Sequence, residues 1–277
     1  MIARVLRLVV FEWKKLFARR FTWIALAILV LAAAVSPLVG QVLLKAEQLQ
    51  RQGAGADSAV PSGWAALANG VKFGTYVATF VLLILAGSSI AEEAQQGTLK
   101  TLLLRPVFRI EVLLAKEIAL ALFAVLLVVV IGAAAGLASA RYDWGSLVDQ
   151  GGKDASTLAR YTLGAFALSL PPLIALVSFG LLFSCAIDHP GYGTGAAIGG
   201  YFVLSAIAGL STKVWDRLFV SYVGLHMDKL YDMGGGVSAA AKEFRELAPS
   251  AVIVPLVSAA AFFAGAAVLL RIRDVAD

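Results

Sequence analysis

Adjacent carboxylates and one histidine near two aspartates are the first side chains in this sequence that could carry chemistry. Glu92 and Glu93 stand side by side at the edge of an apolar run, and His226 lies close to Asp228 and Asp232. The two aspartates share a helical face, but a metal site needs softer and more convergent ligands than this set offers. A solvated amphipathic helix explains these residues better, so we expect no metal site.

The sequence also lacks the residue combinations that hydrolysis, ATP binding or ion coupling would need. Serines and threonines within the apolar runs have no base nearby in the sequence, which gives no support to an intramembrane hydrolase. No G-x-x-x-x-G-K-[ST] phosphate loop occurs, and the glycine-rich run at 191–200 has no lysine. Carboxylates are nearly absent from the middle of the apolar runs, which argues against a proton- or ion-coupled carrier. We expect neither an enzyme nor an ATPase.

The composition identifies the elements that must position these residues. Of the 277 residues 60% are hydrophobic and 15% are charged, whereas soluble domains have about 45–50% and about 25%. Basic residues gather at the ends of apolar segments, as membrane topology requires, and form no stripe suited to nucleic acid. The sequence therefore predicts an all-α integral membrane protein in contact with lipids, with no nucleic-acid partner.

Six apolar segments are long enough to cross a bilayer core, which takes about 20 residues. We place them near 21–44, 70–91, 117–140, 161–187, 193–210 and 252–270, within a single transmembrane domain at 1–277. G-x-x-x-G pairs at Gly132 and Gly136 and at Gly195 and Gly199 predict close helix packing, either inside one subunit or between two copies.

The remaining segments are expected to lie at the two membrane surfaces. Residues 1–20 combine an apolar stripe with basic residues and predict a helix lying along the membrane surface. Lys14 and Lys15 before the first span, and Arg271 and Arg273 after the last, place both termini in the cytoplasm. Residues 211–250 carry two amphipathic stretches, one of them a short helix at 238–247 before Pro249, and are expected at the outer face.

The polar run at 92–116 cannot lie in hydrocarbon, where its charges and broken backbone would stay unsatisfied. With two spans before it and the amino terminus inside, this run lies in the cytoplasm. Residues 91–105 can form a helix that ends before Pro106, and a new helix can start near Phe108. The pattern alone leaves two alternatives, a lateral helix that a partner could push and a plain amphipathic loop on the bilayer.

This run resembles the cytoplasmic loop between the second and third spans of ABC-2-type transporter permeases. The residues that carry the resemblance are Glu-x-x-x-Gly-Thr-Leu from Glu93, then Leu-Leu, Pro-Val, Arg, Leu-Leu and Lys116. The chain differs from the family where Ala115 stands, since a glycine often precedes the lysine there. The resemblance implies a membrane-spanning permease subunit of an ATP-binding cassette exporter, in a bacterial inner membrane.

The resemblance also implies partners and site residues. A separate cytoplasmic ATPase would bind ATP and Mg, with no cofactor in this chain, and a second permease subunit would pair with it. The family pattern assigns ATPase coupling to Glu92, Glu93, Gly97, Thr98, Leu99, Leu102, Leu103, Pro106 and Arg109, with a second contact at Asp188 and His189 and with Tyr201 on the substrate path. The alternative is an ATP-independent channel or a scaffold that anchors other subunits.

Overall fold

The chain folds into long helices in a computed structural model that describes residues 2–50, 63–97, 108–142, 144, 155–226 and 237–272. No strand occurs among these residues. The elements are α1 (Ile2–Ala18), α2 (Arg20–Gln50), α3 (Gly63–Gln95), α5 (Arg109–Ser139), α7 (Ala155–Ala186), α8 (Pro190–Leu210), α9 (Thr212–Trp215), the 3-10 helix η1 (Phe219–Tyr222) and α11 (Val237–Ile272).

Six of these helices are long and apolar enough to cross a membrane. The candidate spans are Arg20–Val39, Ala66–Gln95, Arg109–Ser139, Ala159–Ala186, Pro190–Leu210 and Lys242–Ile272. The prediction of an all-helical protein with six spans is confirmed. A bilayer admits such helices because each satisfies its backbone hydrogen bonds within itself.

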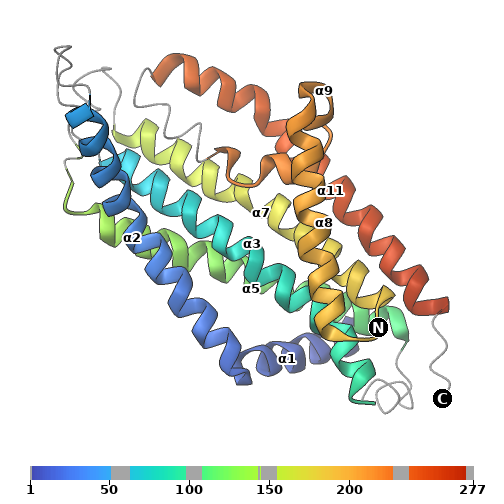
Figure 1. Ribbon diagram of the computed structural model, residues 1–277. Helices are drawn as coiled ribbons and strands as arrows, with labels where there is room; N and C mark the ends of the chain where they lie inside the picture. The colour runs from blue at the N-terminus through green and yellow to red at the C-terminus, as the bar shows by residue number, and fades with distance from the viewer. Residues whose placement is uncertain are drawn as a thin grey trace.

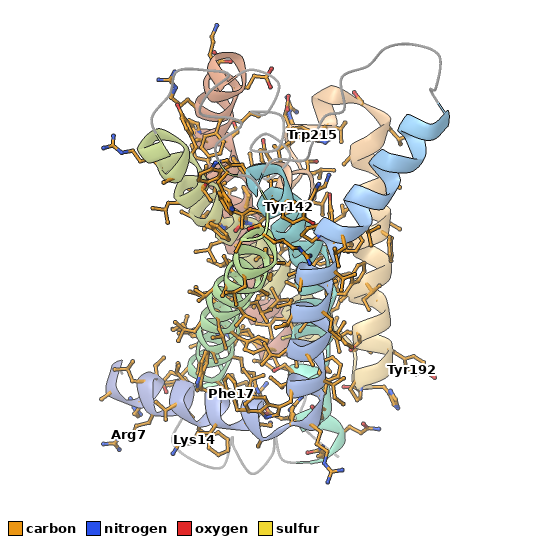
Figure 2. All side chains as sticks on the ribbon, turned by 90° about the vertical axis from the view of Figure 1, so that its left-hand side faces the viewer. Arg7, Lys14, Phe17, Tyr142, Tyr192 and Trp215 are labelled. Carbon is orange, nitrogen blue, oxygen red and sulfur yellow. The ribbon has the colours of Figure 1, made fainter. Side chains whose placement is uncertain are left out.

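The helix α3 is the centre of the bundle. It contacts α2, α5, α7 and α8, and α7 in turn packs along α11 (Figure 1). The 18-residue apolar core of α3 is 61% buried, whereas that of α8, at the edge of the bundle, is only 22% buried (Figure 2). Most of the α8 surface is therefore left without a neighbour in the part of the chain that the structure describes.

The amino-terminal helix α1 lies across one end of the bundle and runs crosswise to the spans (Figure 2). Its buried stripe is made of Val5, Val9 and Leu16, at the spacing of one helical face. Arg7 and Lys14 point away from the bundle. We call this end of the bundle the α1 end; Trp215 and Tyr142 mark the opposite end.

Two local expectations differ from the structure. The helix predicted at 91–105 is interrupted, because Glu92 and Glu93 belong to the last turn of α3 and Gly97 adopts a left-handed φ of 68°. Glycine tolerates this conformation without strain, which is why the helix can end here. The separate short helix predicted at 238–247 is also wrong: α11 continues through Pro249 and Pro255. Each proline removes only one helical hydrogen bond, and packing on α7 supports the continuous helix.

Candidate functional site

Four charged side chains meet in the interior at the α1 end. The Lys116 Nζ donates to Glu93 Oε1 at 2.7 Å and to Glu12 Oε2 at 3.0 Å, and the Lys15 Nζ donates to the same Glu93 oxygen at 2.6 Å. The side chains of Lys116 and Glu93 are each 1% exposed. This group of Glu12, Lys15, Glu93 and Lys116, called the charge cluster below, joins α1, α3 and α5.

The helical spacing of each segment explains why these charges converge. Glu12 lies between Val9 and Leu16 on the buried stripe of α1, so its carboxylate must face the bundle. Lys116 follows Val112 and Leu113 by one turn on the buried face of α5. Both charges are thus placed inside by the apolar residues around them.

Burial makes the cluster depend on the pairing of Lys116 with Glu93 and Glu12. Two carboxylates face two ammonium groups, so the formal charges cancel within the cluster. Desolvating such groups is costly, and removing one partner from a buried pair leaves an uncompensated charge that costs about 3–5 kcal/mol. The cluster therefore holds α1 in one position and resists partial disassembly.

Two further ion pairs lie beside the cluster, one of them open to water on both sides and the other formed with the buried Glu111. The Arg19 Nη2 lies 2.7 Å from Glu92 Oε2, with both side chains about a quarter to a third exposed, and the Arg4 Nη2 lies 3.8 Å from Glu111 Oε1. The exposed pair of Arg19 and Glu92 contributes at most about 1 kcal/mol. They add further contacts of α1 with α3 and α5.

The other end of the segment between α3 and α5 is fastened to a different helix. Near the start of α5, Arg109 donates through Nη1 to the carbonyl of Leu270 at 2.9 Å and to that of Arg271 at 3.4 Å. These carbonyls belong to the last turn of α11, where helical hydrogen bonding leaves them without partners and a cation is favourable. Residues 98–107 thus connect an anchor on α1 and α5 to an anchor on α11.

On its opposite side, the same end of α3 packs closely on α7 and α8. The Ser184 Oγ of α7 accepts from the backbone N–H groups of Ile90 at 2.8 Å and Ala91 at 3.0 Å. A Cβ added at Gly193 would lie 2.6 Å from the Gly87 carbonyl oxygen, so only glycine fits this crossing of α3 and α8. If the end of α3 moves, α7 and α8 must therefore move with it or lose these contacts.

The turn between α7 and α8 lies at the same end of the molecule. Asp188 and His189 are exposed there, and the His189 Nδ1 accepts from the Gly191 N–H at 3.3 Å as the cap of α8. Tyr192, in the first turn of α8, marks this level in Figure 2. The structure places this turn and the charge cluster at one end of the bundle.

A comparison of the sequence with models of protein families shows which family this chain belongs to. The model described as "ABC-2 family transporter protein" matches residues 8–188. The chain belongs to the ABC-2 transporter family. The matched region contains all four residues of the charge cluster and reaches the α7–α8 turn. A search of curated proteins gives no match. As an ABC-2 membrane protein, the chain is a multi-pass transport protein of the permease type rather than an enzyme.

Several residues predicted for this ABC-2 permease occupy positions that sequence reasoning did not anticipate. The Glu93 carboxylate faces inward, Glu92 is at the rim and Gly97 is exposed at the end of α3. Thr98, Leu99, Leu102, Leu103 and Pro106 lie outside the described residues.

Sequence reasoning missed the roles of Glu12, Lys15 and Lys116. A usable signal was present, since Glu12 is the one acidic residue in 1–20 and stands on the apolar stripe. It also missed Glu117, whose Oε1 accepts from the Ser178 hydroxyl at 2.7 Å between α5 and α7. A buried charge needs a charged or polar partner. A single charge on an otherwise apolar helix face therefore predicts that another helix brings such a partner to that face.

Tyr201 lies away from the cluster, beside a cavity of about 380 Å³. Tyr76 of α3, Tyr201 and Ser205 of α8, and Trp215 and Ser221 of the segment that follows α8 line this space, which we call the aromatic cavity. His226 is buried nearby in the chain, with its ring edge-on to Phe244 at 5.3 Å. No group of three potential metal ligands occurs among the described residues; Asp228 and Asp232 fall outside them.

Proposed function

We propose that this chain is the permease subunit of an ABC exporter and receives mechanical work from a separate ATPase through residues 98–107. That ATPase would bind ATP and Mg on the cytoplasmic side of a bacterial inner membrane, where both termini of the permease also lie. One observation carries the proposal: residues 98–107 are flanked by the charge cluster on one side and by the contact of Arg109 with α11 on the other. A force on such a segment would reach α1, α3, α5 and α11 together.

In this mechanism one set of residues binds the ATPase, and another set transmits its movement to the spans. Thr98, Leu99, Leu102, Leu103 and Pro106 would shape the surface that the ATPase binds, with Asp188 and His189 as the smaller second contact. Glu92, Glu93, Gly97 and Arg109 would hold the segment on the spans. ATP-driven closure would switch the spans between two packings, with no covalent chemistry in this chain.

The two roles can be separated by co-purifying variants with the ATPase. Leu102→Asp is expected to prevent complex formation, because it puts a charge on the apolar contact. Glu93→Gln is expected to preserve the complex but to lower transport-linked ATP hydrolysis at least about tenfold, because its contacts with both Lys116 and Lys15 are weakened. Lys14→Gln, on the exposed side of α1, is the control and should change neither quantity. Normal complex formation and hydrolysis in both variants would contradict the proposal and favour an ATP-independent channel or scaffold.

A second copy of the chain would complete the permease. The outward face of α8 supports this: Gly195 and Gly199 have no atom within 4 Å of an added Cβ, and Phe202 and Val203 beside them are more than half exposed. Among the described residues nothing packs closely on Gly195 and Gly199 within the subunit, which supports the contact between two copies. Gly199→Leu should shift the permease from dimer to monomer in light scattering, whereas Gly136→Leu, at an equally open glycine of α5, should not.

A further inference from the structure

Helices α7 and α11 pack side by side along most of the length of α7 (Figure 1). Three contacts define their register: Tyr161 with Phe244, Phe179 with Phe262, and Leu182 with Gly265. The ring centroids of the first two pairs are 5.5 Å and 5.1 Å apart. In every pair the residue of α11 stands 83 positions after its neighbour in α7, so the two helices run in the same direction in one constant register.

One proline of each helix lies at the same height in this register. Pro172 and Pro255 are also 83 positions apart, and both are buried. Pro172 stands seven positions before Phe179, and Pro255 stands seven positions before Phe262. Because a spacing of seven residues is close to two helical turns, each proline lies on the face that carries the contact with the other helix. We call this height, defined by Pro172 and Pro255, the proline level.

Backbone hydrogen bonding is interrupted in both helices at the proline level. A proline inside a helix has no N–H to donate to the carbonyl four residues earlier, and its ring crowds that carbonyl. The carbonyls affected are those of Leu168 and Ala251, again 83 positions apart, and Pro171 removes a further donor from α7. The neighbouring spans α3 and α5 contain no proline. Sharp bends in helices occur mostly at prolines, so α7 and α11 share one height at which they bend most easily.

On the α1 side of the proline level, both helices are tied to the ends of residues 98–107. The Arg109 Nη1 donates to the Leu270 carbonyl of α11 at 2.9 Å. The Ser184 Oγ of α7 accepts from the N–H groups of Ile90 and Ala91, near the end of α3. A movement of residues 98–107 would therefore act on 173–186 and 256–272, which we call the inner halves.

Beyond the proline level, the outer halves at 155–171 and 237–254 have contacts of their own. Phe244 of α11 lies 5.3 Å from the buried His226 ring and nearly perpendicular to it. Phe219, in the same segment as His226, packs instead on the inner halves, between Phe179 and Phe262. Residues 219–226 thus contact both halves, and a bend at the proline level would change the spacing of these two attachments.

We propose that α7 and α11 form one hinge at the level of Pro172 and Pro255, about which their inner halves move as a unit. The constant register requires the two helices to bend together, since a bend in one alone would separate the paired rings on one side of the prolines. This inference rests on the proposed function for its meaning: movement of residues 98–107 bends the two helices and does not tilt them as straight rods. The bending itself concerns α7 and α11 alone.

Distances measured by electron paramagnetic resonance in the permease, reconstituted in nanodiscs without the ATPase, test the hinge. Nitroxide labels are placed at exposed positions, and each pair joins α11 to a helix outside the hinge. Leu137 of α5 with Lys242 reports on the outer halves, and Ile24 of α2 with Val268 reports on the inner halves. The buried Cys185 is replaced by serine, and excess unlabelled permease removes distances between chains.

Straightening the two helices should change the outer distance and leave the inner one. The combined variant Pro171→Ala, Pro172→Ala and Pro255→Ala restores the helical N–H donors at the proline level. Lys242 stands 13 positions before Pro255, a helical length of about 20 Å, so the loss of a bend of about 20° moves it about 7 Å. The outer distance should shift by at least about 4 Å and the inner distance by less than about 2 Å.

Two further variants separate a shared hinge from two independent ones. Pro255→Ala alone should shift the outer distance less than half as far as the combined variant, because the bent α7 still holds α11. Pro37→Ala removes a buried proline from α2, outside the hinge, and should change neither distance. Thermal unfolding establishes that each labelled variant is folded.

Three results would overturn the inference: an unchanged outer distance in the folded combined variant, equal shifts of both distances, or a full shift from Pro255→Ala alone. Equal shifts would mean that the helices tilt as straight rods. Because no ATPase is present, these results are independent of the complex-formation experiment above. Failure to bind an ATPase would leave the hinge standing, and an absent hinge would leave the ATPase contact standing.

Discussion

The Lys116 Nζ lies 3.0 Å from Glu12 Oε2, across 104 positions of the chain. Glu93 shares the same ammonium group from the end of the central helix. A single buried cation thus joins the amino-terminal helix to two spans. This contact makes Lys116 the first residue to change.

Lys116→Met should strongly destabilise the protein. The methionine retains the volume of the stem but leaves two carboxylates buried with one cation, a loss of about 3–5 kcal/mol. Thermal unfolding in detergent at neutral pH measures this loss. Lys14→Met, at an exposed site on α1, is the control. Restoring much of the stability with Glu12→Gln in the Lys116→Met background would confirm the coupling, whereas strictly additive effects would contradict it.

The glycine contact between α3 and α8 gives a prediction with an internal control. Gly193→Ala should cost about 1–3 kcal/mol, because its Cβ would lie 2.6 Å from the Gly87 carbonyl oxygen. Gly195→Ala, two residues along the same helix, meets no described residue and should leave the stability of the subunit unchanged or slightly higher. Comparing the two unfolding midpoints in detergent tests the crossing. Equal midpoints would show that the helices can separate without cost.

Gly97→Ala should weaken the end of α3 by about 1 kcal/mol. The left-handed φ of 68° at this position strains a residue with a Cβ, although no described residue would touch the added methyl group. Hydrogen exchange of the amides at 90–97 should increase in this variant while that of α7 stays the same. Gly136→Ala, an open glycine without an unusual φ, controls for the added methyl group. Unchanged exchange at 90–97 would count against the strained turn.

His226 should make stability depend on pH in the acidic range. Burial lowers the pKa of its imidazole from 6.5 to about 4. Above pH 6.5 the ring is neutral in both states and has no effect. Between pH 6.5 and 4 the histidine is protonated in the unfolded chain but stays neutral in the folded chain. The free energy of unfolding therefore falls by about 1.4 kcal/mol for each pH unit of acidification, and it levels off below pH 4.

Unfolding midpoints measured from pH 7.5 to 4 test this dependence. His226→Phe should flatten the curve in this range, and the same substitution at exposed His189 should leave it in place. A His226→Phe curve parallel to that of the unchanged protein would assign the acid sensitivity to other groups.

The spans could be predicted from sequence because each depends only on its own length and apolar content. The loop motif from Glu93 to Lys116 also led to the family, since its residues are adjacent in the chain. The charge cluster could not be predicted in this way: Glu12, Glu93 and Lys116 come from three helices, and only packing brings them together. The contact between Gly87 and Gly193 could not be predicted for the same reason. These glycines lie on two helices and belong to no common motif, whereas Gly195 and Gly199 form a recognisable G-x-x-x-G pattern.

The bond between Glu12 and Lys116 also sets an order of events during synthesis. Glu12 leaves the ribosome long before Lys116, and until the third span has entered the bilayer its carboxylate has no buried cation to meet. The amino-terminal helix must therefore wait at the membrane surface, hydrated, while two spans are inserted ahead of its partner. The contact of this helix with Lys116 can therefore form only after the third span is in place.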